Sequence, residues 1–126
     1  DNHLAQGGYG LADAVRSARE FLAEQDVTGA KLAAAIVEIE VDTLAQLSDA
    51  LQASPDIVLL YHMTCDELRA AVRLRNESTP TTELEASGGI TLETLRGIAE
   101  TGIDRISIGA LTHSAIGLDV GLDWVG

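Results

Sequence analysis

The chain has 126 residues, 46% of them apolar, and a formal net charge of −12 at pH 7. This length supports one hydrophobic core, so we expect a single domain spanning residues 1–126. The negative charge argues against sequence-independent binding to nucleic acid or to anionic membranes. No apolar stretch reaches the roughly 18 residues of a membrane span. The lone Cys65 allows no internal disulfide and suits a reducing cytoplasm.

Helical and strand-like patterns alternate along the chain. In chain order we expect a helix at about 11–24, a strand at 33–41, a helix at 43–52, a strand at 57–61, a helix at 64–75, a strand at 82–86, a helix at 91–100 and a strand at 105–108. Thr64 and Glu67 have the spacing of a capping box at the start of the third helix. Strands separated by helices imply right-handed βαβ units, so the expected fold class is α/β with parallel βα units. The pattern leaves open a partial (half) TIM-like barrel and an open flavodoxin-like sheet.

Two of the expected strands carry a pair of glutamates separated by one apolar residue. Glu38 and Glu40 share one face of their strand, and Glu83 and Glu85 share one face of theirs. In a βα barrel the apolar face packs against the helices, so these four carboxylates should point inward. Buried carboxylates need cations, a metal or water. Most arginines fall in expected helices, so we expect these carboxylates to lack partners from this chain, leaving them solvated or dependent on another segment.

Two glycine-containing segments close successive strands, at 85–90 and at 109–114. Glycine lets backbone N–H groups approach a ligand, and a helix that begins after the first segment favours an anion through its N-terminal amides. Many βα barrels hold a phosphate with two such loops after consecutive strands. We therefore predict that both segments converge on one anion site.

Five segments stand in the same order and at the same spacing as in a known family: Asp-Asn-His at 1–3, Val-Glu-Ile-Glu-Val-Asp at 37–42, Leu-Glu-Ala-Ser-Gly-Gly-Ile-Thr at 84–91, Gly-Ala-Leu-Thr-His-Ser at 109–114 and Leu-Asp-Val-Gly-Leu-Asp at 118–123. In these segments the chain resembles quinolinate phosphoribosyltransferase, also called carboxylating nicotinate-nucleotide pyrophosphorylase. The resemblance covers the C-terminal part of a family member. The family's N-terminal domain and first barrel strands, with the basic cluster that binds quinolinate, are therefore expected to be absent.

The resemblance implies a cytoplasmic enzyme of NAD biosynthesis. It implies Mg²⁺-dependent transfer of phosphoribose from phosphoribosyl pyrophosphate to quinolinate, followed by decarboxylation to nicotinate mononucleotide. Glu40 matches the acidic residue that binds the ribose hydroxyls, helps to place the metal and is the catalytic candidate. The residues that match the binding site for the 5′-phosphate are Ser87, Gly88, Gly89, Gly109 and His113.

One position departs from the family pattern. After Val58-Leu59-Leu60 the family has Asp-Asn or a close variant, and this chain has Tyr61-His62. Tyr61 thus stands where the second ribose or metal carboxylate is expected, and phenols stay protonated near neutral pH and ligate Mg²⁺ poorly. We predict that the chain alone does not catalyse the reaction.

A second function class remains open, a non-catalytic half-barrel of natural or engineered origin. The chain begins with Asp1, which fits a processed, truncated or engineered protein. A half-barrel exposes its inner face and two sheet edges, so self-association into a homo-oligomer is expected in either class.

Overall fold

The computed structural model describes residues 10–24 and 35–109. Helices and strands alternate in the order α2 (Leu11–Glu24), β1 (Glu38–Val41), α4 (Leu44–Leu51), β2 (Ile57–Tyr61), α5 (Cys65–Ser78), β3 (Glu83–Ser87), α6 (Leu92–Ala99) and β4 (Arg105–Ile106). Every expected element is present, so the alternation predicted from the sequence is confirmed. No helix in the described ranges is long and apolar enough to cross a membrane.

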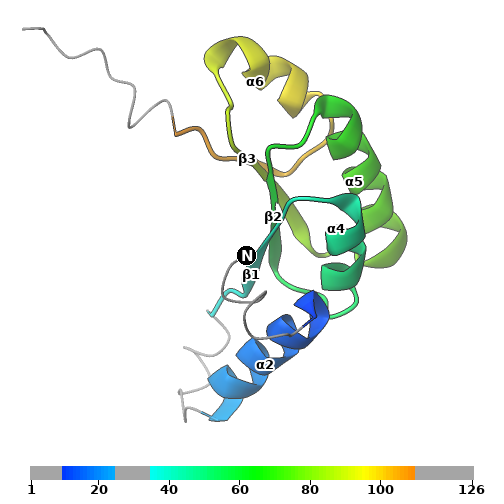
Figure 1. Cartoon of the computed structure of the whole chain (residues 1–126), viewed down its shortest axis with the longest axis vertical. Helices are drawn as coiled ribbons and strands as arrows, with labels where there is room; N and C mark the ends of the chain where they lie inside the picture. The colour runs from blue at the N-terminus through cyan, green and yellow to red at the C-terminus, as the bar shows by residue number, and fades with distance from the viewer. Residues whose placement is uncertain (1–9, 25–34, 110–126) are drawn as a thin grey trace, which may run out of the picture.

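The four strands form one parallel sheet in the order β1-β2-β3-β4. Helices α4 and α5 line the convex side of this curved sheet, with α6 beyond α5, and no helix of the described residues covers the opposite side (Figure 1). A flavodoxin-like sheet would reverse its strand order after the first crossover and place helices on both faces. The strictly sequential order therefore selects the segment of a βα barrel from the two arrangements that the pattern left open.

The core lies between the convex face of the sheet and the helices. Alternate strand residues point to this face because successive side chains in a strand alternate sides. Burying each large aliphatic side chain contributes about 1.5–3 kcal/mol. The strand residues buried here are Ile39, Val41, Val58, Leu60, Leu84 and Ala86, and the helix residues include Leu47, Ala50, Leu51, Leu68, Ala71 and Ile98.

Each helix that follows a strand within the sheet begins at a threonine. The side chains of Thr43, Thr64 and Thr91 accept the backbone N–H three residues further on, which satisfies one free amide of each helix start. The capping box predicted at Thr64 and Glu67 is confirmed, and hydrogen bonds from Thr64 lower the pKa of the Glu67 carboxyl. The carboxyl ends of the strands therefore lead directly into well-formed helix N-termini.

Two predicted strands are shorter than expected. Among residues 35–41, the described part of the first expected strand, pairing begins at Glu38, because its neighbour β2 starts at Ile57, the partner of Glu38 in the register. The last pairs only over Arg105–Ile106, rather than to residue 108. Conversely, the helix expected to end near Arg75 continues to Ser78. A β-branched run marks a potential strand, but the neighbouring strand decides its paired length.

A polar residue stands just before each of the last three strands. Its side chain makes a hydrogen bond to the backbone near the start of the preceding strand. Asp56 accepts the N–H of Val37 at 2.8 Å, and the Thr82 hydroxyl donates to the Pro55 carbonyl at 2.8 Å. Asp104 accepts the Leu84 N–H at 2.8 Å and the guanidinium of Arg75 at 2.7 Å. Arg75 is buried and also donates to the Thr82 carbonyl. The amino ends of neighbouring strands are thus linked by a network of hydrogen bonds. Such a network stabilises the sheet.

Candidate functional site

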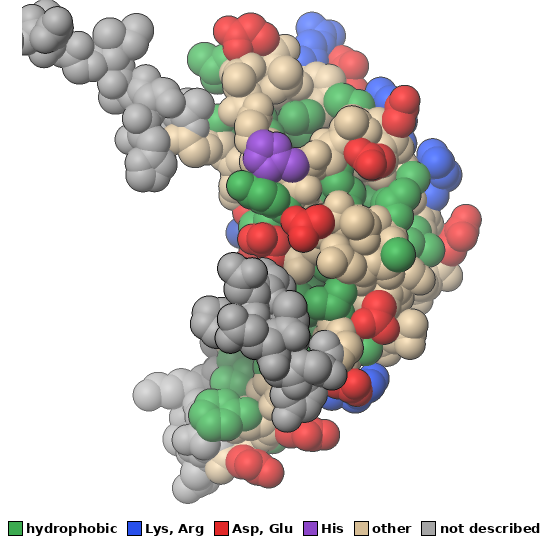
Figure 2. Space-filling model, viewed as in Figure 1, with side chains coloured by type: hydrophobic (Ala, Val, Ile, Leu, Met, Phe, Trp, Pro, Cys, Tyr) green, Lys and Arg blue, Asp and Glu red, His purple; other side chains and the backbone are tan. Residues whose placement is uncertain are grey.

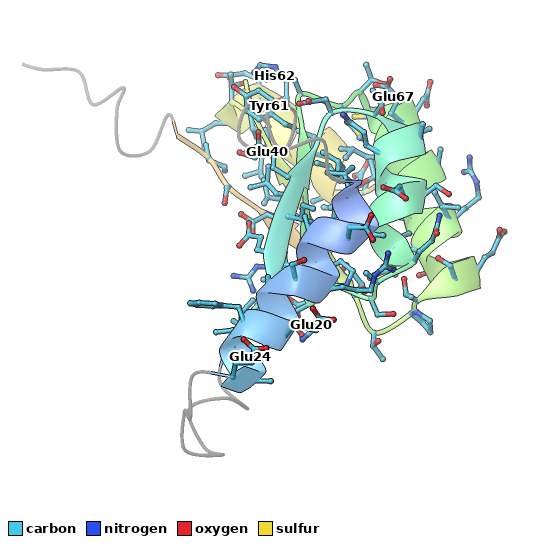
Figure 3. All side chains as sticks on the ribbon, turned by 60° about the horizontal axis from the view of Figure 1, so that its bottom comes forward. Glu20, Glu24, Glu40, Tyr61, His62 and Glu67 are labelled. Atoms are coloured by element: carbon cyan, nitrogen blue, oxygen red, sulfur yellow. The ribbon has the colours of Figure 1, made fainter. Side chains whose placement is uncertain are left out.

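The carboxyl ends of β1, β2 and β3 bring the predicted site residues to one edge of the sheet. In the register Glu40 lies opposite Leu59, and Tyr61 lies opposite Ser87. These residues belong to the face that points away from the helices, and the side chains of Glu40, Tyr61 and His62 lie at the same end of the sheet (Figure 3). Glu40 and Tyr61 are both exposed. The fold therefore places these residues at one edge of the sheet.

The turn after β3 has the backbone conformation that the glycine pattern predicted, in which N–H groups are available to a ligand. Gly88 and Gly89 have φ angles of +89° and +65°, a region that residues with a Cβ atom rarely adopt. Neither N–H of these two glycines donates a hydrogen bond within the part of the chain that the structure describes. The buried Ile90 follows, and α6 begins two residues later. The turn therefore offers two free amides next to a helix N-terminus, an arrangement that favours a bound anion.

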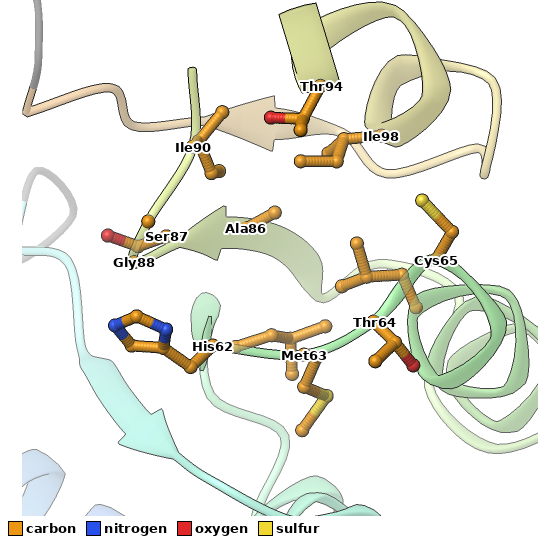
Figure 4. A pocket seen from close by; sticks show the side chains of 13 residues that line it. His62, Met63, Thr64, Cys65, Ala86, Ser87, Gly88, Ile90, Thr94 and Ile98 are labelled. Atoms are coloured by element: carbon orange, nitrogen blue, oxygen red, sulfur yellow. The ribbon is translucent and has the colours of Figure 1, made fainter.

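His62 packs directly against this turn. Its backbone N–H donates to the Ser87 carbonyl at 2.9 Å, and its φ angle is +55°. A Cβ atom on Gly88 would lie 2.5 Å from Cδ2 and 2.9 Å from Nε2 of the imidazole. Figure 4 shows the ring beside Gly88, with Ser87 above it. Nothing in the sequence placed His62 beside the glycine turn, because the contact joins two loops distant in the chain.

A pocket of about 270 Å³ opens between the β2–α5 and β3–α6 loops. Its polar lining comes from the two glycines and from His62, Thr64, Ser87 and Thr94. Its apolar lining comes from Leu60, Met63, Cys65, Leu68, Ala86, Ile90 and Ile98. In Figure 2 a histidine and acidic side chains gather on the side of the molecule where this edge lies. The pocket combines an anion-compatible wall with an apolar floor.

The two glutamate pairs have different surroundings. Arg105 contacts Glu83 and Glu85, each at 3.1 Å, and the Ser107 hydroxyl also hydrogen-bonds to Glu85. The expectation that all four carboxylates lack partners was therefore wrong for this pair, because β4 itself supplies a cation. Arg105 is the partner of Glu85 in the register of β3 and β4, which the sequence alone does not give. These contacts also raise the pKa of the Arg105 guanidinium, led by the hydrogen bond to Glu83.

Glu38 and Glu40 have no ion pair or hydrogen bond with a side chain in the described ranges, so for them the expectation holds. Both lie on β1, at the edge of the sheet opposite Arg105 on β4. Glu40 is two residues closer to the carboxyl end and thus to the glycine turn. Of the four glutamates, it is the one that is both free and near the candidate site.

The second glycine segment is described only at its start. Gly109 is exposed and follows β4, the strand next to β3, so it lies at the same edge of the sheet as Ser87. His113 and the rest of that segment lie outside the described residues, as do His3 and the segment at 118–123. Their predicted roles stay predictions.

The described ranges hold no group of three or more His, Cys, Asp or Glu side chains that could bind a metal. At the candidate site Glu40 is a single exposed carboxylate, with the Tyr61 phenol on the neighbouring strand. One carboxylate is sufficient for a Mg²⁺ that also binds substrate phosphates, but not for a resident metal. The donor set therefore fits a metal that enters with its substrate.

Sequential parallel strands with helices on their convex face define this chain as a segment of a βα barrel. The chain belongs to the family described as quinolinate phosphoribosyl transferase, C-terminal domain, whose model matches residues 1–123. The family resemblance drawn from the motifs is thereby confirmed.

Relatives and solved structures agree with this assignment. The chain is 39% identical to nicotinate-nucleotide pyrophosphorylase [carboxylating] of Mycobacterium leprae, over 98% of the chain and 39% of that protein. It is 37% identical to the human protein of the same name, over 97% of the chain and 38% of that protein. The crystal structure of NadC from Streptococcus pyogenes matches with a TM-score of 0.73 and 33% identity, over 94% of the chain and 37% of that structure. The chain thus spans about two fifths of the length of these relatives.

Proposed function

We propose that this chain is the phosphoribose-binding part of a carboxylating nicotinate-nucleotide pyrophosphorylase in NAD biosynthesis. That reaction joins quinolinate to phosphoribosyl pyrophosphate and releases pyrophosphate and carbon dioxide, giving nicotinate mononucleotide. The names of the relatives support this assignment. The observation that carries it is the meeting of Glu40 and the free amides of Gly88 and Gly89 at one edge of the sheet.

Each residue has a role suited to its chemistry. The turn at 87–89 binds the 5′-phosphate through backbone amides and the Ser87 hydroxyl, with Gly109 and His113 completing the site from the next loop. Glu40 accepts hydrogen bonds from the ribose hydroxyls. Its negative charge also stabilises the positive charge that develops on the ribose when the bond to pyrophosphate breaks. Amides hold the phosphate without adding a full charge nearby.

Mg²⁺ enters this proposal with the pyrophosphate of the substrate, where it offsets the charge of the leaving group. Glu40 is the described side chain suited to contact it. Tyr61 occupies the place of the family's second carboxylate, and its hydroxyl can donate or accept a hydrogen bond there.

The chain alone is expected to be inactive. Quinolinate is a dianion, and the cation on the inner face of the described sheet, Arg105, is already paired with Glu83 and Glu85. The relatives carry about three fifths of their length outside the matched region, and we propose that this remaining part supplies the quinolinate site. A net charge of −12 further disfavours binding of a dianion by the chain itself.

Calorimetric titration with ribose 5-phosphate and with ribose tests the proposal. We expect measurable binding of ribose 5-phosphate, none of ribose, and at least tenfold weaker binding in Gly88→Ala, since a side chain at φ +89° would distort the turn. Gly102→Ala is the matched control: its φ is +87°, so it has similar backbone strain, but it lies beyond the end of α6, away from the turn. Equal binding by both variants, or no preference for the phosphate, would overturn the proposal.

We also infer that the chain self-associates and functions in the cytoplasm. Ile36 and Tyr61 are 64% and 42% exposed, and β1 and β4 are open edges within the described sheet. Exposed apolar side chains and strand edges favour association. Light scattering at micromolar concentration should show a mass above 13.2 kDa, and a monomer at every concentration would contradict this inference. The partly buried free thiol of Cys65 fits a reducing compartment.

A further inference from the structure

His62 has a backbone conformation that most residues avoid. Its φ of +55° lies in the left-handed region, where Asn, Asp and His are the most frequent residues other than glycine. The hydrogen bond from its N–H to the Ser87 carbonyl holds this conformation at the end of β2. The result is that the imidazole is turned toward the next loop rather than along its own strand.

The imidazole fills the space that the two glycines leave open. A Cβ atom on Gly88 would lie 2.5 Å from its Cδ2 atom, and one on Gly89 would lie 3.1 Å from Cε1. Its ring makes an edge-to-face contact with Tyr61, at 4.4 Å between centroids. Within the described ranges, neither ring nitrogen has a hydrogen-bond partner. A polar ring is thus held against the turn while its nitrogens remain available to a ligand.

We propose that His62 is a specificity residue of the phosphate site, whose imidazole forms one wall of the Ser87–Gly89 turn and donates an N–H to a phosphate bound there. This proposal rests on the proposed function. His62, Ser87 and both glycines line the same pocket, so an anion on the free amides of the turn lies within reach of the ring. When protonated, the imidazole adds a positive charge beside the neutral amides and hydroxyl of the Ser87–Gly89 turn.

Other titratable groups lie on the neighbouring elements. Tyr61 and Cys65 adjoin the ring and the pocket, and carboxylates stand on β1 (Glu40), just after β1 (Asp42), and in the first turns of α5 (Asp66 and Glu67) and α6 (Glu93). Hydrogen bonds at the helix N-caps, from Thr64 and Thr91 respectively, hold the pKa values of Glu67 and Glu93 below their ordinary value. These two groups therefore stay charged from pH 5.5 to 8.5. A variant at position 62 then shows how much of the pH dependence of binding comes from the histidine and how much from the other groups.

Sulfate is the probe, because it remains a dianion over this pH range. We expect the full chain to bind sulfate about tenfold more tightly at pH 5.5 than at pH 8.5, as charge-assisted hydrogen bonds exceed neutral ones. His62→Asn keeps a residue type that tolerates the left-handed backbone, and should reduce this ratio to about twofold or less. In NMR spectra, the imidazole signals that disappear in His62→Asn should be those that shift when sulfate is added.

His113→Asn is the matched control, since it removes the histidine that the family resemblance assigns to the same phosphate. A pH dependence that persists in His62→Asn and disappears in His113→Asn would overturn the proposal, while leaving the phosphate site intact. Tighter sulfate binding by His62→Asn would also overturn it, because the ring would then be blocking the turn. Absence of sulfate binding by the chain at every pH would refute both this inference and the phosphate site of the proposed function.

Discussion

The polar groups at the two ends of the sheet differ in whether they have hydrogen-bond partners. At the amino ends, Asp56, Thr82 and Asp104 each bind the start of the preceding strand, and Arg75 is buried among them. At the carboxyl ends, Glu40 and the amides of the glycine turn have no partner within the described ranges. Satisfied polar groups stabilise a fold, whereas free ones are available to a ligand. In this sheet the amino ends of the strands thus carry contacts that stabilise the fold, and the carboxyl ends carry groups available for binding.

This separation follows from the parallel arrangement. All carboxyl ends meet at one edge, where the helices also begin, so amides and helix dipoles accumulate there. The amino ends meet at the other edge, where the chain returns from each helix and short polar side chains can link neighbouring strands. If the comparison is correct, substitutions at the two ends should change different measured quantities.

The largest expected effect is on stability, at the amino end. Asp104→Ala should lower the free energy of unfolding by about 2–3 kcal/mol, because it leaves the buried Arg75 without its carboxylate and the Leu84 N–H without an acceptor. Urea unfolding followed by circular dichroism measures this change. Affinity for ribose 5-phosphate should remain within twofold of the unsubstituted chain.

Two controls sharpen this prediction. Asp104→Asn keeps an oxygen that accepts the Leu84 N–H, so it should lose about half as much stability. Glu100→Gln removes the partner of Arg96 from an exposed ion pair, and should change the free energy of unfolding by less than about 0.5 kcal/mol. If Asp104→Ala also abolished ligand binding in folded protein, the two ends would not be separable.

The sequence predicted most of the fold, because helical and strand periodicities differ and alternate cleanly. It also predicted the position of the glycine turn, since Gly88 and Gly89 follow a strand and precede a helix. It did not predict the partner of Glu85, because that requires the register that brings Arg105 beside it. The number of arginines in the expected helices does not indicate which strand residues pair in this register.

Contacts between loops also could not be predicted from the sequence. The position of His62 against Gly88 depends on a left-handed residue at the end of β2 and on the adjacency of β2 and β3. Similarly, Arg75 stands at the end of an expected helix, and it is buried because Asp104 and the Thr82 carbonyl lie within reach. Periodicity reports which side of an element faces the core, but it does not report which distant polar groups meet there.

The smaller expected effect is on affinity, at the carboxyl end. Glu40→Gln should weaken binding of ribose 5-phosphate about tenfold, since hydrogen bonds from the ribose hydroxyls to a carboxylate are stronger than those to an amide. Its affinity for sulfate should be unchanged or slightly higher, because sulfate has no ribose and the substitution removes a negative charge. Glu38→Gln makes the same change two residues nearer the amino end of β1, and should leave both affinities within twofold. Calorimetry with the two ligands measures all four values. Equal losses in both variants would mean that the effect is not specific to position 40, and the division between the two ends of the sheet would then not extend to Glu40.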